Sequence, residues 1–124
     1  MIIKYNNIII KQLMLFGKGV ELKTSKQRKI FMNLISLFNS IAFASDDIAT
    51  MKCFKCLPIQ MNGDIGTITF VTKAMCVELE FKYDSNVNQI EINRLKINMY
   101  GKEQKSNRKN ICSYASREYS QTGT

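Results

Sequence analysis

Apolar and polar residues alternate most regularly between residues 75 and 83. Every second residue there is apolar, and the residues between them are Cys or charged. This period of two predicts a half-buried β-strand with one solvated face. A shorter alternating run precedes it, with turn residues near Lys73-Ala74, and residues 84–88 also have turn chemistry. Residues 66–100 therefore predict an antiparallel meander of three strands.

The last of these strands changes phase in its middle. Two apolar sets flank the change, Ile90 and Ile92 before it and Leu95, Ile97 and Met99 after it. Asn93 and Arg94 are the two polar residues between the sets. A β-bulge inserts one extra residue and would return both sets to one face. We therefore expect a bulge at Asn93-Arg94.

Residues 25–44 have the period of a helix. Lys29, Asn33, Ser36 and Ser40 form one polar stripe, and most other positions are apolar. An apolar arc this wide is typical of a helix buried on most sides. We expect this helix to pack on the sheet, with Thr24 or Ser25 as its N-cap. The same breadth is compatible with a dimer interface.

The N-terminal segment reads as extended. The β-branched runs on either side of Asn6-Asn7 predict a hairpin within residues 1–24. A helix over residues 8–16 is the competing interpretation. Residues 46–62 are expected to be irregular or a short helix, capped by Asp46 and ended by Pro58 and Asn62-Gly63.

These elements predict an α+β fold. We expect an N-terminal hairpin, then one main amphipathic helix (about 25–44) packed on a mostly antiparallel sheet, then the meander. At 124 residues, the chain is expected to form a single domain over residues 1–100. Residues 101–124 are expected to be a basic polar tail, in which four residues could dock as a short element: Ile111, Cys112, Tyr114 and Tyr119.

Positive charge is concentrated before and after the meander. Residues 1–63 carry nine Lys/Arg against three Asp/Glu, residues 64–100 carry four against five, and residues 101–124 carry five against two. The formal net charge is +8, and the sequence pI is near 9.4. Such a charge favours a polyanion or an acidic protein surface as partner. We expect part of the Lys excess to come from codon bias. Ile, Lys and Asn together supply 41 residues, and all three amino acids are encoded by AT-rich codons.

The basic residues are the candidate binding site. They form two groups, Lys18, Lys23, Lys26, Arg28 and Lys29 around the start of the helix, and Lys102, Lys105, Arg108, Lys109 and Arg117 in the tail. Lys-rich patches neutralise phosphates without reading bases. Tyr114 and Tyr119 lie among the tail charges and could stack on bases. We expect the two groups to meet on one side of the molecule.

The four cysteines leave several interpretations open. Cys53 and Cys56 form a single C-x-x-C pair, which can supply two thiolates to zinc. A complete four-thiolate site would also need Cys76 and Cys112, and neither of these belongs to a second C-x-x-C. We therefore expect structural thiols and no metal site, with zinc or a redox pair as alternatives.

Catalytic patterns are sparse. The chain has no His, so the commonest general base is missing. Glu78 and Glu80 share one strand face, as solvated carboxylates often do. Gly17-Lys18-Gly19 lacks the spacing of a phosphate-binding loop. We expect a protein that is not an enzyme and binds no cofactor.

One segment resembles an export signal. A basic cluster at residues 26–29 precedes an apolar run that ends in Ala42-Phe43-Ala44. Polar residues interrupt the run, and it lies far from Met1, so we expect a cytoplasmic protein with no membrane contact. A secreted four-Cys domain starting after Ala44 is the alternative.

The sequence favours a small basic binding protein that contacts the RNA or DNA backbone, alone or within a larger assembly. The first alternative is a phage- or virus-type interaction module or inhibitor that binds an acidic surface of a host protein. A homodimer is compatible with either hypothesis.

Overall fold

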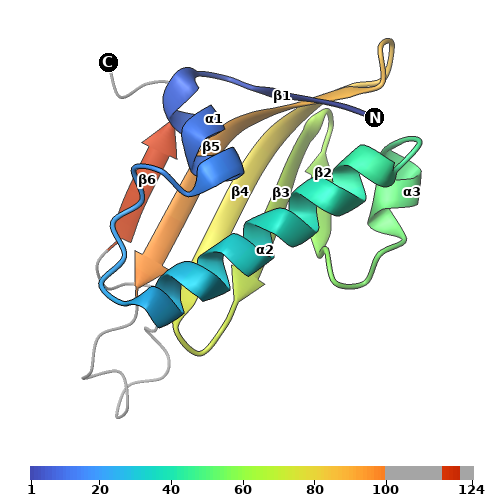
Figure 1. The fold of residues 1–124 in the computed structure, drawn as a ribbon. Coiled ribbons are helices and arrows are strands. Elements are labelled where there is room, and N and C mark those ends of the chain that lie inside the picture. The colour runs from blue at the N-terminus through green and yellow to red at the C-terminus, as the bar shows by residue number, and fades with distance from the viewer. Residues whose placement is uncertain (100–115, 121–124) are drawn as a thin grey trace.

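A computed structural model describes residues 1–99 and 116–120, which form helices on one face of a twisted sheet (Figure 1). The helices are α1 (Ile8–Phe16), α2 (Ser25–Ala44) and α3 (Ile48–Lys52). The strands are β1 (Ile2–Tyr5), β2 (Ile59–Asn62), β3 (Ile65–Val71), β4 (Met75–Asp84), β5 (Gln89–Met99) and β6 (Ser116–Ser120). The α+β class is therefore confirmed.

The sheet is mixed. Its main path runs in the order β1-β5-β4-β3-β2, with β6 also paired to β5. β2 to β5 form an antiparallel meander, whereas β1 runs parallel to β5. β4 pairs with the whole length of β5, so β1 and β6 share the other edge of β5 end to end. β1 pairs with residues 89–92 of β5, and β6 pairs with residues 94–98.

The meander has four strands, one more than the sequence predicted. Asn62-Gly63 begins the two-residue turn between β2 and β3, where Gly63 has a φ of 65°. The expectation that Asn62-Gly63 ends a short helix is therefore wrong. The four residues of β2 are too few to show a period of two, so only the pairing with β3 identifies this strand.

The predicted bulge in β5 is confirmed. Glu80 lies opposite Arg94, but the next residue, Phe81, lies opposite Ile92, so Asn93 is the extra residue. The side-chain nitrogen of Asn6 donates to Oδ1 of Asn93 at 3.1 Å. The bulge therefore lies where β1 leaves β5 and β6 begins to pair with it.

The predicted main helix is confirmed as α2. Thr24 is its N-cap, and its hydroxyl oxygen accepts the backbone N–H of Gln27 at 3.1 Å. Five residues of α2 are buried: Phe31, Ile35, Phe38, Ile41 and Ala42. The Phe38 ring packs against Phe81 of β4, with centroids 6.3 Å apart. Burial is narrower than expected, because Leu37 and Phe43 face solvent.

The predicted N-terminal hairpin is wrong, and the competing helix is right. The Asn7 side chain accepts the N–H of Ile10 at 2.9 Å and caps α1. Gly17 ends α1 in the left-handed region, with a φ of 65°. Ile10, Leu13 and Met14 are buried, so tertiary packing overrides the β-propensity of the three isoleucines. β1 pairs instead with β5.

Two smaller expectations are also settled. The short helix α3 is capped by Asp47 and not by Asp46, because the Asp47 carboxylate accepts the N–H of Thr50 at 2.8 Å. Residues 116–120 of the expected tail form β6, and Tyr119 packs against the core, as predicted. The remaining residues of that segment lie outside the described part of the chain.

Candidate functional site

The basic cluster comprises Lys18, Lys23, Lys26, Arg28 and Lys29. Lys18 and Lys23 lie in the loop between α1 and α2, and the other three lie in the first turns of α2. All five residues are exposed. The loop is held in place by Val20, which is buried in the core. The sequence-predicted residues of this group therefore lie together at one end of the molecule.

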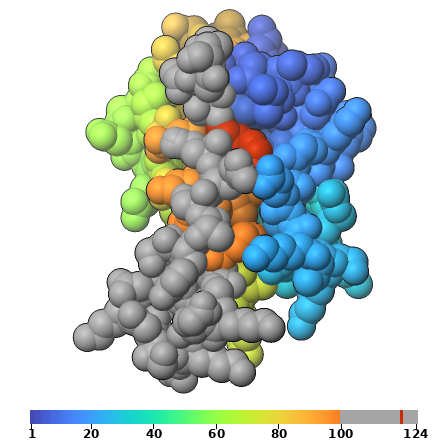
Figure 2. Space-filling view, turned by 90° about the vertical axis from the view of Figure 1, so that its left-hand side faces the viewer, coloured from blue at the N-terminus to red at the C-terminus, as the bar shows by residue number. Residues whose placement is uncertain are grey.

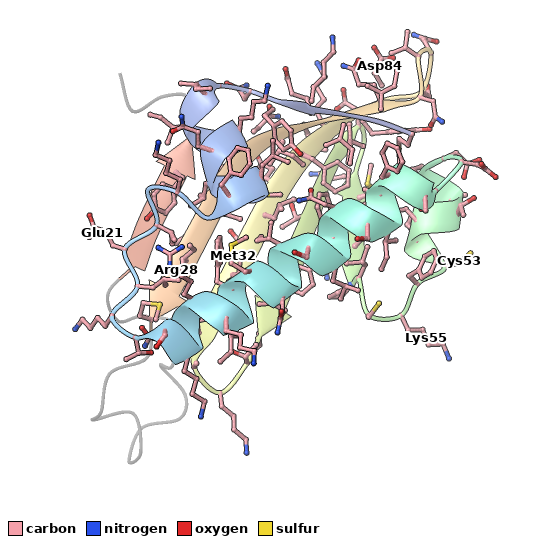
Figure 3. The ribbon with its side chains drawn as sticks, viewed as in Figure 1. Glu21, Arg28, Met32, Cys53, Lys55 and Asp84 are labelled. Carbon is pink, nitrogen blue, oxygen red and sulfur yellow. The ribbon has the colours of Figure 1, made fainter. Side chains whose placement is uncertain are left out.

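Arg28 has a different role from the lysines around it. Its Nη1 donates to the carbonyl oxygen of Gly17 at 3.1 Å, so it braces the loop against α2 (Figure 3). The backbone N–H of Lys23 donates to the Gln27 side chain at 2.9 Å and fixes the other end of the loop. Lys18 and Lys23 therefore lie on a loop that is held at both ends, and Lys26 and Lys29 lie on α2.

Among the described residues, the cations of the cluster outnumber the carboxylates near them in the chain. Glu21 is the only acidic residue among residues 1–44, which carry seven Lys/Arg. The first turn of α2 has no acidic residue. Cations at a helix N-terminus are opposed by the helix dipole, by about 0.3–1 kcal/mol each. Within residues 1–99 and 116–120, none of the salt bridges involves a cation of the cluster. An anion at this end would relieve the repulsion.

Lys73 is a further cation that the sequence analysis missed. It is exposed in the β3–β4 turn, which lies at the same end of the molecule as the start of α2 (Figure 1). The turn itself was predicted, but nothing in the local pattern showed which end of the helix it would approach.

Of the five tail cations, only Arg117 lies in the described part of the chain. Lys102, Lys105, Arg108 and Lys109 lie outside the described residues. Arg117 belongs to β6, which contacts α1. In Figure 2, the small part of β6 that is drawn in colour lies between β5 and the surface formed by α1 and the loop after it. The backbone of Arg117 thus lies on the side that carries the loop of the basic cluster.

The cysteine pair lies away from the basic cluster. Cys53 and Cys56 are exposed after α3, near the opposite end of α2 (Figure 3). Cys76 is buried on β4, and Cys112 lies outside the described residues. Within the described part of the chain, no three His, Cys, Asp or Glu side chains gather to hold a metal ion.

The paired carboxylates on β4 are part of a charge network. Both lie on the sheet face opposite the helices. Nη2 of Arg94 lies 3.2 Å from Glu80 and 3.9 Å from Glu78. Arg94 thus interacts across strands with both carboxylates, an arrangement that is typical of a solvated sheet face.

An apolar groove lies between β1, α1 and α2, and the sequence analysis missed it. Its volume is about 610 Å³, and its apolar walls come from Met1, Ile2, Ile3, Tyr5, Leu15 and Phe43. Phe43 is 77% exposed, and Ile2 is 53% exposed. Burial raises the pKa of the Tyr5 phenol above its ordinary value of 10.0. The apolar composition of residues 8–16 was the available signal, because such a helix is rarely left half exposed.

Polar groups tie the walls of the groove together. Asn39 of α2 lines the groove, and its Nδ2 donates to the carbonyl oxygen of Met14 in α1 at 3.1 Å. At the N-terminus, the amino group of Met1 donates to the carbonyl oxygen of Ser45 at 2.9 Å. These bonds tie α1 to α2, and the N-terminus to the C-cap residue of α2.

Comparison of the chain with protein-family models, with curated proteins and with solved structures finds no match. Among the described residues, no helix combines the length and apolar character needed to cross a bilayer.

Proposed function

We propose that this chain is a non-enzymatic binding protein whose basic cluster contacts the phosphate backbone of a nucleic acid. The observation that carries the proposal is the unbalanced charge at one end of the molecule. Lys18, Lys23, Lys26 and Lys29 are exposed there, and the described residues supply no carboxylate that forms a salt bridge with them.

The shape of the cluster supports contact with a backbone. Arg28 braces the loop that carries Lys18 and Lys23, and Lys26 and Lys29 lie on a helix. All four lysines therefore project from ordered backbone. The ammonium groups of lysine side chains neutralise phosphates whatever the base sequence is. Lys73 adds a further charge at the same end. The tail cations belong to the proposal through their charge alone.

The test is a binding titration over a series of salt concentrations. Fluorescence anisotropy with a labelled DNA duplex and a labelled single-stranded RNA measures affinity from 50 to 300 mM salt. If four lysines each neutralise one phosphate of the duplex, the slope of log K against log salt is about −3.6. No binding at the lowest salt, or a slope near zero, overturns the proposal.

A pair of matched variants locates the contact. The triple variant K23Q/K26Q/K29Q removes three charges from the basic cluster and is expected to weaken duplex binding at least about tenfold. The control K52Q/K55Q/K82Q removes the same number of exposed charges elsewhere on the molecule. It is expected to keep most of the affinity. Equal losses in the two variants would show that net charge alone attracts the nucleic acid.

A further inference from the structure

Phe16 is an exposed aromatic side chain at the edge of the basic cluster. It is the last residue of α1, and 67% of it is exposed. The next residue is Gly17, whose carbonyl oxygen accepts the hydrogen bond from Arg28. Lys18 is exposed, and its Cα lies at most about 7.6 Å from that of Phe16, because only two peptide bonds separate them. Figure 2 shows the surface of α1 passing directly into that of the loop after it.

Position distinguishes Phe16 from the other exposed aromatic side chains. Among the described residues, three phenylalanines are exposed: Phe16, Phe43 and Phe54. Phe43 lies in the last turn of α2 and Phe54 follows α3, so both are near the end of α2 that is opposite to the basic cluster. Tyr119, for which the sequence predicted stacking, packs against the core. Phe16 is therefore the exposed aromatic side chain that adjoins the cluster.

Phe16 belongs to a solvent-facing side of α1 that is mostly apolar. The other exposed apolar residues of this helix are Ile8, Ile9 and Leu15. An exposed apolar patch of this kind marks an interaction surface, but apolar area alone does not select the partner.

The charges next to Phe16 select a partner that is both anionic and apolar. Of the seven cations in residues 1–44, five form the basic cluster, and the single carboxylate of these residues is Glu21 in the same loop. The strand β6, which contacts α1, adds one cation and one carboxylate, Arg117 and Glu118. A single-stranded nucleic acid combines a charged phosphate with an apolar, aromatic base in every nucleotide, so it is complementary to a ring that is bordered by lysines.

We propose that Phe16 stacks on a base and that the basic cluster therefore binds single-stranded nucleic acid in preference to duplex. The inference rests on the proposed function and names the substrate class of the same site. Lys18 and the other lysines of the cluster hold phosphates, while the ring of Phe16 covers one face of a base. In a duplex, neighbouring base pairs cover both faces of each base, so the ring has nothing to stack on. Every base has a π-face, so the site does not require a particular sequence.

The first test compares substitutions of Phe16 by anisotropy, with labelled DNA and RNA single strands of about 12 nucleotides and a DNA duplex of the same length. The wild type is expected to bind the single strands more tightly than the duplex at equal salt. F16L keeps an apolar side chain but has no π-face, so it should weaken single-strand binding at least about fivefold, as expected for one lost stack. F16Y keeps the ring and should bind as the wild type does.

Two controls accompany these variants. F43L makes the same substitution at an exposed phenylalanine away from the basic cluster and should leave single-strand binding unchanged. F16L should leave duplex binding and the salt slope unchanged, because it removes no phosphate contact. Tighter binding of the duplex by the wild type, equal losses in F16L and F43L, or equal losses of single-strand and duplex binding in F16L would each overturn the proposal.

A spectroscopic test reports on the contact itself. The chain has no Trp, so F16W introduces a single fluorophore at the proposed stacking position. Single-stranded oligo-dT is expected to quench its fluorescence saturably, with the same midpoint as the anisotropy titration. The matched variant F43W should show no quenching. Equal quenching of the two variants contradicts the proposal.

The outcomes also separate this proposal from the one on which it rests. If nucleic acid binds through the lysines but F16L has no effect, the stacking proposal fails and the proposed function stands. If no nucleic acid binds at the lowest salt, both fail. A concentration-dependent dimer in sedimentation that F16L abolishes would make the exposed side of α1 a self-association surface and would overturn the stacking proposal.

Discussion

The meander (β2 to β5) and the N-terminal region (β1 and α1) are built in opposite ways. In the meander, consecutive strands pair with each other, and Ile68, Leu79 and Phe81 are completely buried. Its charges pair across strands, as Arg94 does with Glu80. In the N-terminal region, β1 has one partner strand in the described structure, and that partner lies more than eighty residues away in sequence. Four apolar residues of α1 face solvent.

The difference separates scaffold from surface. The meander and α2 bury most of the large side chains, so their residues are constrained by packing. The N-terminal region keeps apolar groups, cations and a strand edge in contact with solvent. Such groups add little to the stability of the isolated chain. They are the groups that a partner can use.

The largest expected effect is on the meander. Gly66 lies opposite Phe81, and a Cβ added at Gly66 would lie 2.3 Å from the Phe81 ring. Phe81 is buried and packs against Phe38, so the ring has no free space to move into. We expect Gly66→Ala to lower the free energy of unfolding by about 3 kcal/mol, measured by urea denaturation.

The double variant G66A/F81L provides the control. The smaller side chain at 81 makes room for the new methyl group, so the two losses should be less than additive. Strict additivity would show that Gly66→Ala acts through the backbone and not through the Phe81 ring.

An intermediate effect compares two helix caps. Asn7→Ala and Thr24→Ala each remove one side-chain acceptor and should each cost about 1 kcal/mol. If α1 opens by itself, N7A speeds hydrogen exchange of the α1 amides about fivefold. T24A should leave exchange in α1 unchanged and speed exchange in β4, because α2 packs on the meander.

The contradicting outcome concerns α1 in the T24A variant. If T24A speeds exchange of the α1 amides as much as that of the β4 amides, then α1 opens only when the whole fold opens. The N-terminal region would then be part of the scaffold.

The smallest effect is expected at α3, which comes after the N-terminal region and before the meander in sequence. Hydrogen bonds from Thr50, first from its backbone N–H and then from its hydroxyl, lower the pKa of Asp47 below its ordinary value of 3.8. The carboxylate therefore stabilises the folded state above that value, and the stabilisation is lost as pH falls through the lower, folded-state pKa. The Thr50 amide signal in NMR should titrate with a midpoint below 3.8 in the wild type. It should not titrate in Asp47→Asn, which keeps a capping side chain without the charge.

The two regions also differ in how well the sequence predicts them. β3, β4, β5 and α2 were predicted, because each is long enough to show its period of 2 or 3.6 residues. The bulge at Asn93 followed from the same periodicity. α1 was assigned to a hairpin because its isoleucines favour strands in isolation. Its cap at Asn7 and the burial of Leu13 and Met14 outweigh that local preference.

The candidate sites show the same limit. The residues of the basic cluster are close in sequence, so their proximity in space was predictable from the sequence. The groove brings together Ile3, Leu15 and Phe43 from three separate elements. No local pattern links them, because the link is the parallel pairing of β1 with β5.

That pairing has a consequence for synthesis of the protein. Asn6 and Asn93 are 87 residues apart. At about 5–20 residues per second, the ribosome takes roughly 4 to 17 s to make the chain between them. β1 emerges long before β5, and its place in the sheet does not exist until β5 follows. During this interval the apolar residues of α1 are available to chaperones, whereas each strand of the meander can pair with its predecessor as it emerges.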